Sequence, residues 1–93
     1  MQLRLYVSQG SMSSLAAVEN VERLREVRPE LDLTLEIVDV RARPDITAED
    51  RILATPTLLK VSPLPSRRIV GDLGDIDLVV RYLTAGDGPG GST

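Results

Sequence analysis

The sequence contains no histidine and no cysteine. Without histidine, the chain lacks the commonest general base and the commonest metal ligand. Without cysteine, it has no disulfide, no thiolate nucleophile and no thiolate metal site. These two absences exclude most ordinary catalytic constellations, so we expect a protein that is not an enzyme and that uses no cofactor and no metal.

Aromatic residues are scarce, and the chain has no long apolar run. Aromatics make up 2% of its 93 residues, both of them tyrosine, whereas 42% of the residues are hydrophobic. That content is enough for one core, which must be built from aliphatic side chains. The N-terminal apolar stretch is interrupted at Arg4, which argues against a signal peptide or a membrane span. We therefore expect one domain in the cytoplasm, without membrane contact.

The charge balance is slightly acidic and rich in arginine. The chain has 11 Lys and Arg residues and 14 Asp and Glu residues, for a net charge of −3. This balance is not typical of a nucleic-acid-binding protein. Every cation except Lys60 is an arginine. Arginine suits bidentate pairing with carboxylates at interfaces, although GC-rich codon usage would give the same excess. The composition thus predicts no nucleic-acid partner and leaves an arginine interface as a hypothesis.

The N-terminal third predicts a strand followed by a helix. Residues 2–7 alternate apolar and polar side chains, the period of a half-buried strand. The pattern turns Leu3, Leu5 and Val7 toward the core and Gln2, Arg4 and Tyr6 outward. A helix over 14–27 follows, capped by one of Ser11, Ser13 or Ser14. Its apolar face is centred on Ala17, Val21 and Leu24.

A second strand is predicted over 31–40, where apolar and polar residues again alternate. The inward positions are Leu31, Leu33, Leu35 and Ile37. The helix between the two strands is long enough for a crossover, so we expect the strands to be parallel and joined right-handedly.

Proline marks the elements that follow. Pro44 opens a short helix that runs to Ala54, with Asp45 or Thr47 as its cap. Pro56 ends this helix and begins a strand, because proline lacks a backbone N–H and is tolerated at the first residue of a strand.

The C-terminal third predicts a hairpin and a last helix. Strands over 57–61 and 67–70 are joined by a connection too short for a crossover, which indicates an antiparallel pair. A helix over 75–84, capped by Asp72 or Asp75, has one apolar face made of Ile76, Val79, Val80 and Leu83.

The resulting order is β-α-β-α-β-β-α, the thioredoxin-like arrangement with a mixed four-stranded sheet. We assign residues 1–84 to this domain and residues 85–93 to a flexible glycine-rich tail. Pro56 occupies the position of the cis-proline of thioredoxin-like proteins, so we expect a cis Thr55–Pro56 bond. The stretch Ser8–Ser14, where such proteins place their redox pair, has no cysteine, which excludes thiol–disulfide exchange.

Arg51, Arg67 and Arg68 form the most informative basic feature of the sequence. Neighbouring strand residues point to opposite faces, so Arg67 and Arg68 are not expected to share one. One interpretation is that charge protects an edge strand from aggregation. The functional interpretation is an electrostatic docking surface for an acidic partner.

The segments 49–58 and 67–73, together with Leu3–Val7 and Val38–Val40, resemble the KaiB family of circadian clock proteins over roughly residues 2–83. The resemblance implies a non-enzymatic regulator that binds the ATPase ring of a KaiC-like protein and displaces a sensor histidine kinase. It places Arg51, Arg67 and Arg68 on the docking surface. The alternative function is a stand-alone thioredoxin-like adaptor in stress or two-component signalling, with an unrelated partner.

The resemblance also implies two competing folds. One is a thioredoxin-like monomer, and the other is a KaiB-specific, tetramer-forming β-α-β-β-α-α-β fold. This sequence departs from the clock members at Ala16, where they carry a basic residue, and in its glycine-rich tail. Tyr82 and Thr84 stand where those members have Gly and Asp. Glycine costs a helix about 1 kcal/mol relative to alanine, so we expect the thioredoxin-like state at rest.

Overall fold

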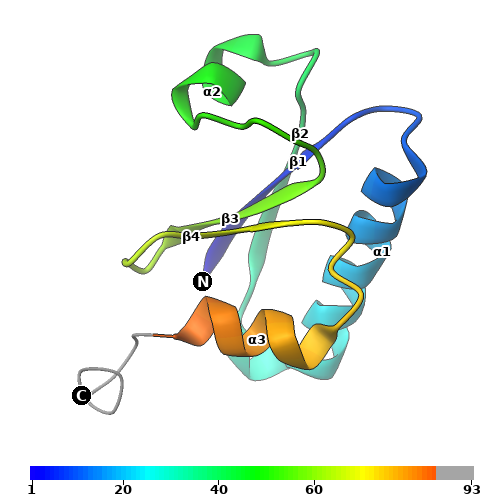
Figure 1. Cartoon of the computed structure of the whole chain (residues 1–93). Coiled ribbons are helices and arrows are strands. Elements are labelled where there is room, and N and C mark those ends of the chain that lie inside the picture. The colour runs from blue at the N-terminus through cyan, green and yellow to red at the C-terminus, as the bar shows by residue number, and fades with distance from the viewer. Residues whose placement is uncertain (86–93) are drawn as a thin grey trace.

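The chain alternates strands and helices in the predicted order, as seen in a computed structural model that describes residues 1–85 (Figure 1). Most of the predicted tail, residues 86–93, lies outside the described residues. The elements are β1 (Gln2–Val7), α1 (Met12–Val27), the 3₁₀ turn η1 (Pro29–Leu31), β2 (Thr34–Asp39), α2 (Pro44–Glu49), β3 (Thr57–Ser62), β4 (Arg67–Val70) and α3 (Ile76–Thr84).

The four strands form one mixed sheet in the order β2-β1-β3-β4. β1 runs parallel to β2 and antiparallel to β3, and β4 pairs antiparallel with β3 at the edge. The predicted parallel crossover and the predicted hairpin are both confirmed. The chain therefore has the thioredoxin-like arrangement rather than the alternative KaiB-specific order of elements.

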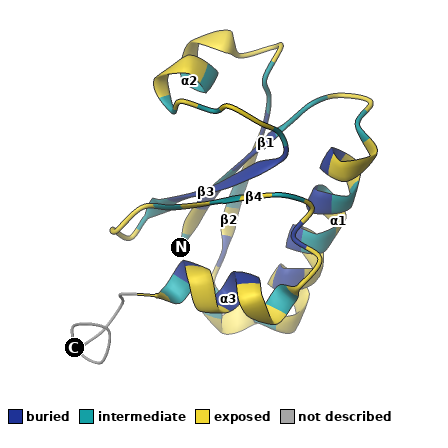
Figure 2. Cartoon of the chain, in the orientation of Figure 1, coloured by how far each residue is buried: buried dark blue, intermediate teal, exposed yellow. Residues whose placement is uncertain are grey.

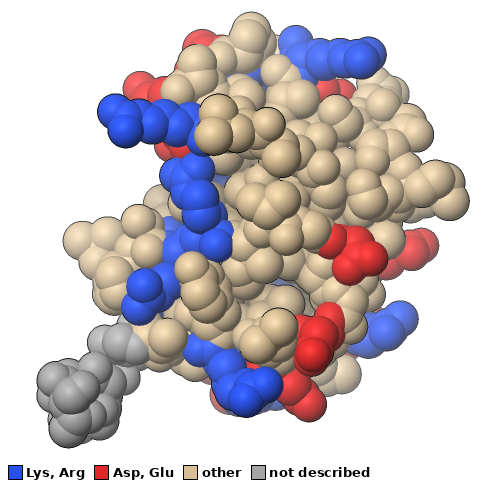
Figure 3. Space-filling model, viewed as in Figure 1, with Lys and Arg blue, Asp and Glu red and all other residues tan. Residues whose placement is uncertain are grey.

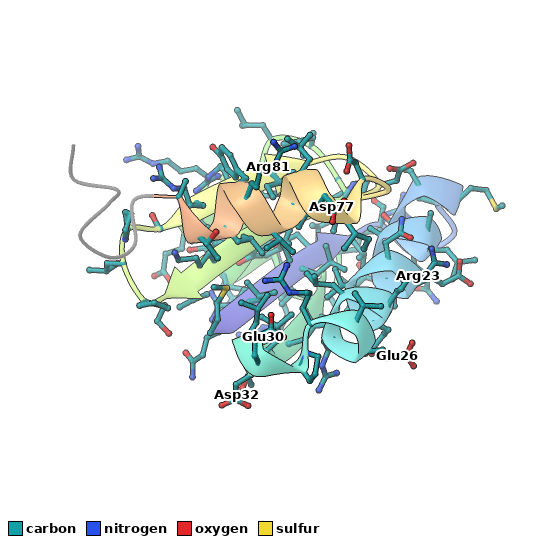
Figure 4. The ribbon with its side chains drawn as sticks, turned by 90° about the horizontal axis from the view of Figure 1, so that it is seen from below. Arg23, Glu26, Glu30, Asp32, Asp77 and Arg81 are labelled. Carbon is teal, nitrogen blue, oxygen red and sulfur yellow. The ribbon has the colours of Figure 1, made fainter. Side chains whose placement is uncertain are left out.

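Helices α1 and α3 cover one face of the sheet, as the view from below shows (Figure 4). The predicted inward positions of both helices are buried there against the strands, apart from Ile76, which is partly buried (Figure 2). Ser11 caps α1 by accepting from the backbone N–H of Ser14, and Asp75 caps α3 in the same way at Leu78. The main core is an aliphatic cluster of Leu3, Leu5, Ala17, Val21, Leu24, Leu33, Leu58, Leu73, Val79, Val80 and Leu83.

The opposite face is covered near one end by α2 and the segment after it. Tyr6, Val38 and Leu59 are buried there, with Ile46 and Ile52 packed against them. Tyr6 was predicted to face out, and it does lie on the face opposite Leu5, but it is fully buried. The strand pattern cannot reveal this, because it gives the side of the sheet and not what covers that side.

The second strand is shorter than predicted and only partly buried. It begins at Thr34, because Pro29–Leu31 forms the 3₁₀ turn and Asp32 adopts a left-handed conformation with φ 50°. Ile37 lies on the face of Leu5, as predicted, but remains 47% exposed. β2 is an edge strand, so no further strand shields it.

The second helix ends at Glu49 rather than at Ala54. Arg51 has φ 55°, a left-handed conformation that terminates the helix. Neither predicted cap is used. The Thr47 hydroxyl donates to the carbonyl of Arg43 at 2.7 Å, and Asp45 instead pairs with the Arg43 guanidinium.

The segment before β3 carries Pro56, and the Thr55–Pro56 bond is cis. The Ser62–Pro63 and Leu64–Pro65 bonds in the hairpin connection are also cis. Within residues 1–85, no helix is long and apolar enough to cross a membrane.

Candidate docking surface

Arg51 and Arg68 meet on the face of the sheet that α2 covers. Arg51 directly follows the end of α2, and Arg68 lies on the edge strand β4. The Arg68 Nη1 donates to the backbone carbonyl of Arg51 at 3.2 Å. Both side chains are exposed, so two cations separated by 17 positions in the sequence are presented together.

Arg67 points to the other face, toward α3. Its guanidinium carbon lies 5.8 Å from the centre of the Tyr82 ring, and its Nη2 donates to the carbonyl of Ala85 at 3.0 Å. Its Nε is buried and has no hydrogen-bond partner among the described residues. Arg67 is thus half-buried and held against the end of α3, whereas Arg68 is exposed and its guanidinium bonds to the backbone of Arg51.

A band of basic side chains runs across this side of the molecule, from the region of α2 past the β4 edge to α3 (Figure 3). Helix α3 contributes Arg81, its one cation, which is exposed (Figure 4). We call Arg51, Arg67, Arg68 and Arg81 the arginine band. Arg81 was not among the residues predicted from the sequence. The available signal was its place opposite the apolar face of the last helix.

A polar network holds the residue that precedes Arg51. The carboxylate of Asp50 accepts from Arg4 Nη1 at 3.0 Å and from the Tyr6 hydroxyl through a short hydrogen bond. Arg4 Nε also donates to Glu36 at 2.9 Å. This network was not predicted from the sequence, because its members come from three separate elements.

The network keeps its donors protonated. Burial, and then the hydrogen bond to Asp50, raise the pKa of Tyr6 to about 12. The ion pair with Glu36, supported by Asp50, raises the pKa of Arg4 above its usual value. Tyr6 is therefore a hydrogen-bond donor at neutral pH, and Asp50 is anchored from two sides. This fixes the point at which the chain leaves α2 and presents Arg51.

The β3–β4 hairpin also holds the C-terminal end of α3. The buried Lys60 donates from Nζ to the carbonyl of Leu83 at 2.7 Å, and Arg67 reaches Ala85. Cations near the last carbonyls of a helix interact favourably with its dipole. The Tyr82 ring adds a contact with the Arg67 guanidinium. The Thr84 hydroxyl bonds within α3 itself, where it donates to the carbonyl of Val80 at 2.9 Å.

The position that holds a redox pair in thioredoxins is structural here. In the stretch Ser8–Ser14, the Ser14 hydroxyl accepts from the backbone N–H of Ser8 at 3.0 Å, and Ser11 caps α1. Within residues 1–85, no group of three or more acidic residues is gathered in a way that could hold a metal ion.

Comparison with known proteins gives the family of this chain. Residues 4–85 match the KaiB domain. The chain belongs to the KaiB family. It is 44% identical over 78 residues to the circadian clock oscillator protein KaiB of Synechococcus elongatus, covering 84% of this chain and 76% of that protein. It is 38% identical to the KaiB of Nostoc punctiforme, covering 91% and 88%. These relatives support a regulatory role in a circadian clock.

Solved structures give the same fold. The N-terminal domain of Synechococcus elongatus SasA is similar with a TM-score of 0.73 and 25% identity, covering 95% of this chain and 87% of that one. Mitochondrial thioredoxin 3 of Saccharomyces cerevisiae follows at a TM-score of 0.72 and 17% identity, covering 89% and 76%. The second similarity establishes the thioredoxin-like fold alone.

Proposed function

We propose that this KaiB-family protein is a non-enzymatic clock regulator that binds the ATPase ring of a KaiC-like protein through its arginine band. The observation that carries the proposal is the joining of Arg51 and Arg68 on one exposed face. Membership of the KaiB family supports a partner among clock proteins.

Charge gives this surface its selectivity. The chain has a net charge of −3, so its clustered cations form a local positive area on an acidic molecule. Such an area accelerates encounter with an acidic partner and disfavours basic ones. Arginine also pairs with carboxylates through two parallel hydrogen bonds, which adds orientation to attraction. The partner surface is thus expected to carry Asp or Glu where it meets Arg51 and Arg68.

Binding to the isolated N-terminal ATPase ring of a KaiC-like protein tests the proposal. The double variant Arg51→Glu and Arg68→Glu reverses two exposed charges. It should raise the dissociation constant at least about tenfold, which corresponds to a loss of about 1.4 kcal/mol in binding free energy. The dissociation constant of the wild type should also rise with salt, since exposed charges are screened. Calorimetry or biolayer interferometry would measure both effects.

The matched control is Arg23→Glu. Arg23 is an exposed arginine on α1, with no ion pair among residues 1–85, and it changes the net charge by the same amount per substitution (Figure 4). Arg67 is unsuitable for charge reversal because it contacts Tyr82 and Ala85. The single variant Arg68→Glu changes the net charge by the same amount as Arg23→Glu. Equal loss of affinity in these two single variants would show that net charge alone explains the effect and would contradict a specific docking surface.

The second candidate is a thioredoxin-like adaptor in stress or two-component signalling, for which the similarity to the SasA N-terminal domain is the supporting observation. Lack of wild-type binding to the ATPase ring, together with capture of a sensor histidine kinase, would favour it. In either role we expect a cytoplasmic monomer in the thioredoxin-like state, with a dimer or tetramer as the alternative. Sedimentation of the free protein distinguishes these states.

A further inference from the structure

The β4 edge of the sheet carries unused backbone hydrogen-bonding groups. Val70 pairs with Thr57 across the hairpin, and the N–H of Gly71 donates to the carbonyl of Pro56 at 3.0 Å. Bonded and non-bonded pairs alternate in an antiparallel ladder, so Arg68 and Val70 direct their N–H and C=O groups away from β3. No hydrogen bond among the described residues uses these outward groups.

An apolar groove of about 500 Å³ lies between this edge and α3. Its walls include Ile69 from β4 and Leu78, Val79 and Tyr82 from α3. Leu78 is 54% exposed and Tyr82 is 44% exposed, so large apolar side chains flank an open strand edge. Strand edges of this kind are natural templates for pairing with an extended segment.

The two faces beside the edge differ in chemistry. An added strand would point alternate side chains to opposite faces. One set would enter the apolar groove, and the other would lie beside Arg68 and Arg51 on the α2 side. The complementary segment therefore alternates apolar and acidic residues. A second copy of this chain fits poorly, because antiparallel pairing of two β4 edges would bring arginines together.

We propose that the β4 edge binds an extended acidic–apolar segment of a partner protein by strand addition. The segment becomes a fifth strand next to β4, with its apolar side chains against Leu78 and Tyr82 and its carboxylates beside Arg68. This goes beyond the docking of an ATPase ring, because it specifies a linear segment and requires no ATPase.

A short peptide in which valine alternates with glutamate, blocked at both ends and fluorescently labelled, tests the inference without any partner protein. Anisotropy should show saturable binding, and amide shifts in ¹⁵N spectra should concentrate at Arg68, Val70 and Leu78. A peptide with lysine in place of glutamate should bind at least about tenfold more weakly, because it repels the arginines. N-methylation at the residues that face β4 should abolish binding by removing the donors.

Val70→Pro provides the test on the protein side. The Val70 N–H faces away from β3, so proline should leave the ladder intact, as it does on other edge strands. We expect it to abolish peptide binding, whereas the matched variant Val70→Thr, which keeps the N–H, should bind as the wild type does. If Val70→Pro lowers stability, Leu78→Asp provides a second test, because Leu78 is exposed. This variant should still weaken binding of the valine–glutamate peptide.

Three outcomes would overturn the inference. The first is equal binding of the glutamate and lysine peptides, or full binding of the N-methylated peptide. The second is a set of amide shifts centred on the β2 edge. The third is a wild type that dimerises in sedimentation and a Val70→Pro variant that does not, since a second copy would then occupy the edge. Whether or not the protein binds the ATPase ring of a KaiC-like protein, each of these outcomes would still overturn the inference.

Discussion

The two faces of the sheet are built on different principles. On the face covered by α1 and α3, eleven buried residues form one cluster, and nearly all contacts are aliphatic. On the face covered by α2, the clustered buried residues within 1–85 are only Tyr6, Val38 and Leu59. There Ile46 and Ile52 pack against this small cluster, and polar contacts that converge on Asp50 also join the helix segment to the sheet.

This difference suggests that one face supplies most of the folding stability and the other positions the arginines for binding. Aliphatic burial is non-directional and scales with area, so the larger cluster must supply most of the folding free energy. Hydrogen bonds contribute less net free energy but fix geometry. The α2 face carries the network that presents Arg51 beside Arg68. We therefore expect changes on the first face to alter stability, and changes on the second to alter binding before they alter stability.

The largest expected effect is on the α1 and α3 face. Leu5 is completely buried in the middle of the sheet. Leu5→Ala should lower the free energy of unfolding by about 2–5 kcal/mol, through lost burial and the cavity left behind. Urea denaturation followed by circular dichroism measures this. A loss as small as that caused by an exposed substitution such as Leu15→Ala would contradict the claim that this face supplies most of the folding free energy.

The Tyr6 hydroxyl tests the α2 face. Tyr6→Phe keeps the ring but removes a hydrogen bond to a carboxylate, which should cost about 1–3 kcal/mol. It should also weaken the partner affinity by freeing Asp50. Loss of stability without loss of affinity would contradict the role assigned to the network.

The same hydroxyl predicts a pH dependence. The pKa of Tyr6 is raised from 10.0 to about 12 in the folded protein, mainly by burial. A pKa that is higher in the folded state means that folding favours the protonated form, so this stabilisation is complete below pH 10.0 and is lost as the pH rises through about 12. The difference in unfolding free energy between the wild type and Tyr6→Phe should therefore shrink over this window. A constant difference would contradict the assignment.

A smaller effect is expected at Tyr82, at the exposed margin of the face covered by α1 and α3. Tyr82→Gly introduces a poor helix former and removes the contact with Arg67, which together should cost about 1–2 kcal/mol. Tyr82→Ala removes the same contact without the backbone penalty and serves as the control. Hydrogen exchange of the α3 amides should accelerate more in the glycine variant than in the alanine variant. Equal exchange would show that backbone propensity does not limit α3.

The sequence pattern predicted the order of the elements and the inward face of each long helix. This succeeded for α1 and α3 because their apolar positions repeat with the helical period, so burial of Ala17, Val21 and Leu83 follows from spacing. It failed at the end of α2, where Arg51 adopts a positive φ that the residue type does not predict. It also failed at Tyr6, because alternation along a strand does not say what covers the second face.

The candidate site was predicted in part. Arg51, Arg67 and Arg68 were selected by their charge and by the family resemblance, and alternation along β4 correctly separated the last two. The contact between Arg51 and Arg68 joins positions on different elements. The free edge of β4 depends on which strand lies last in the sheet, and the sequence order does not give that.

By itself, the sequence determined which side-chain chemistries this chain lacks and the elements from which it is built. A chain without cysteine or histidine has no thiol chemistry and no imidazole base, whatever its fold. Only the tertiary structure decided that Tyr6, Arg4 and Asp50 form one network, that Arg67 turns to α3 and Arg68 to Arg51, and that β4 is an open edge. The physical reason is that composition and periodicity are local properties, whereas an interaction surface is made by residues that the fold brings together from distant positions.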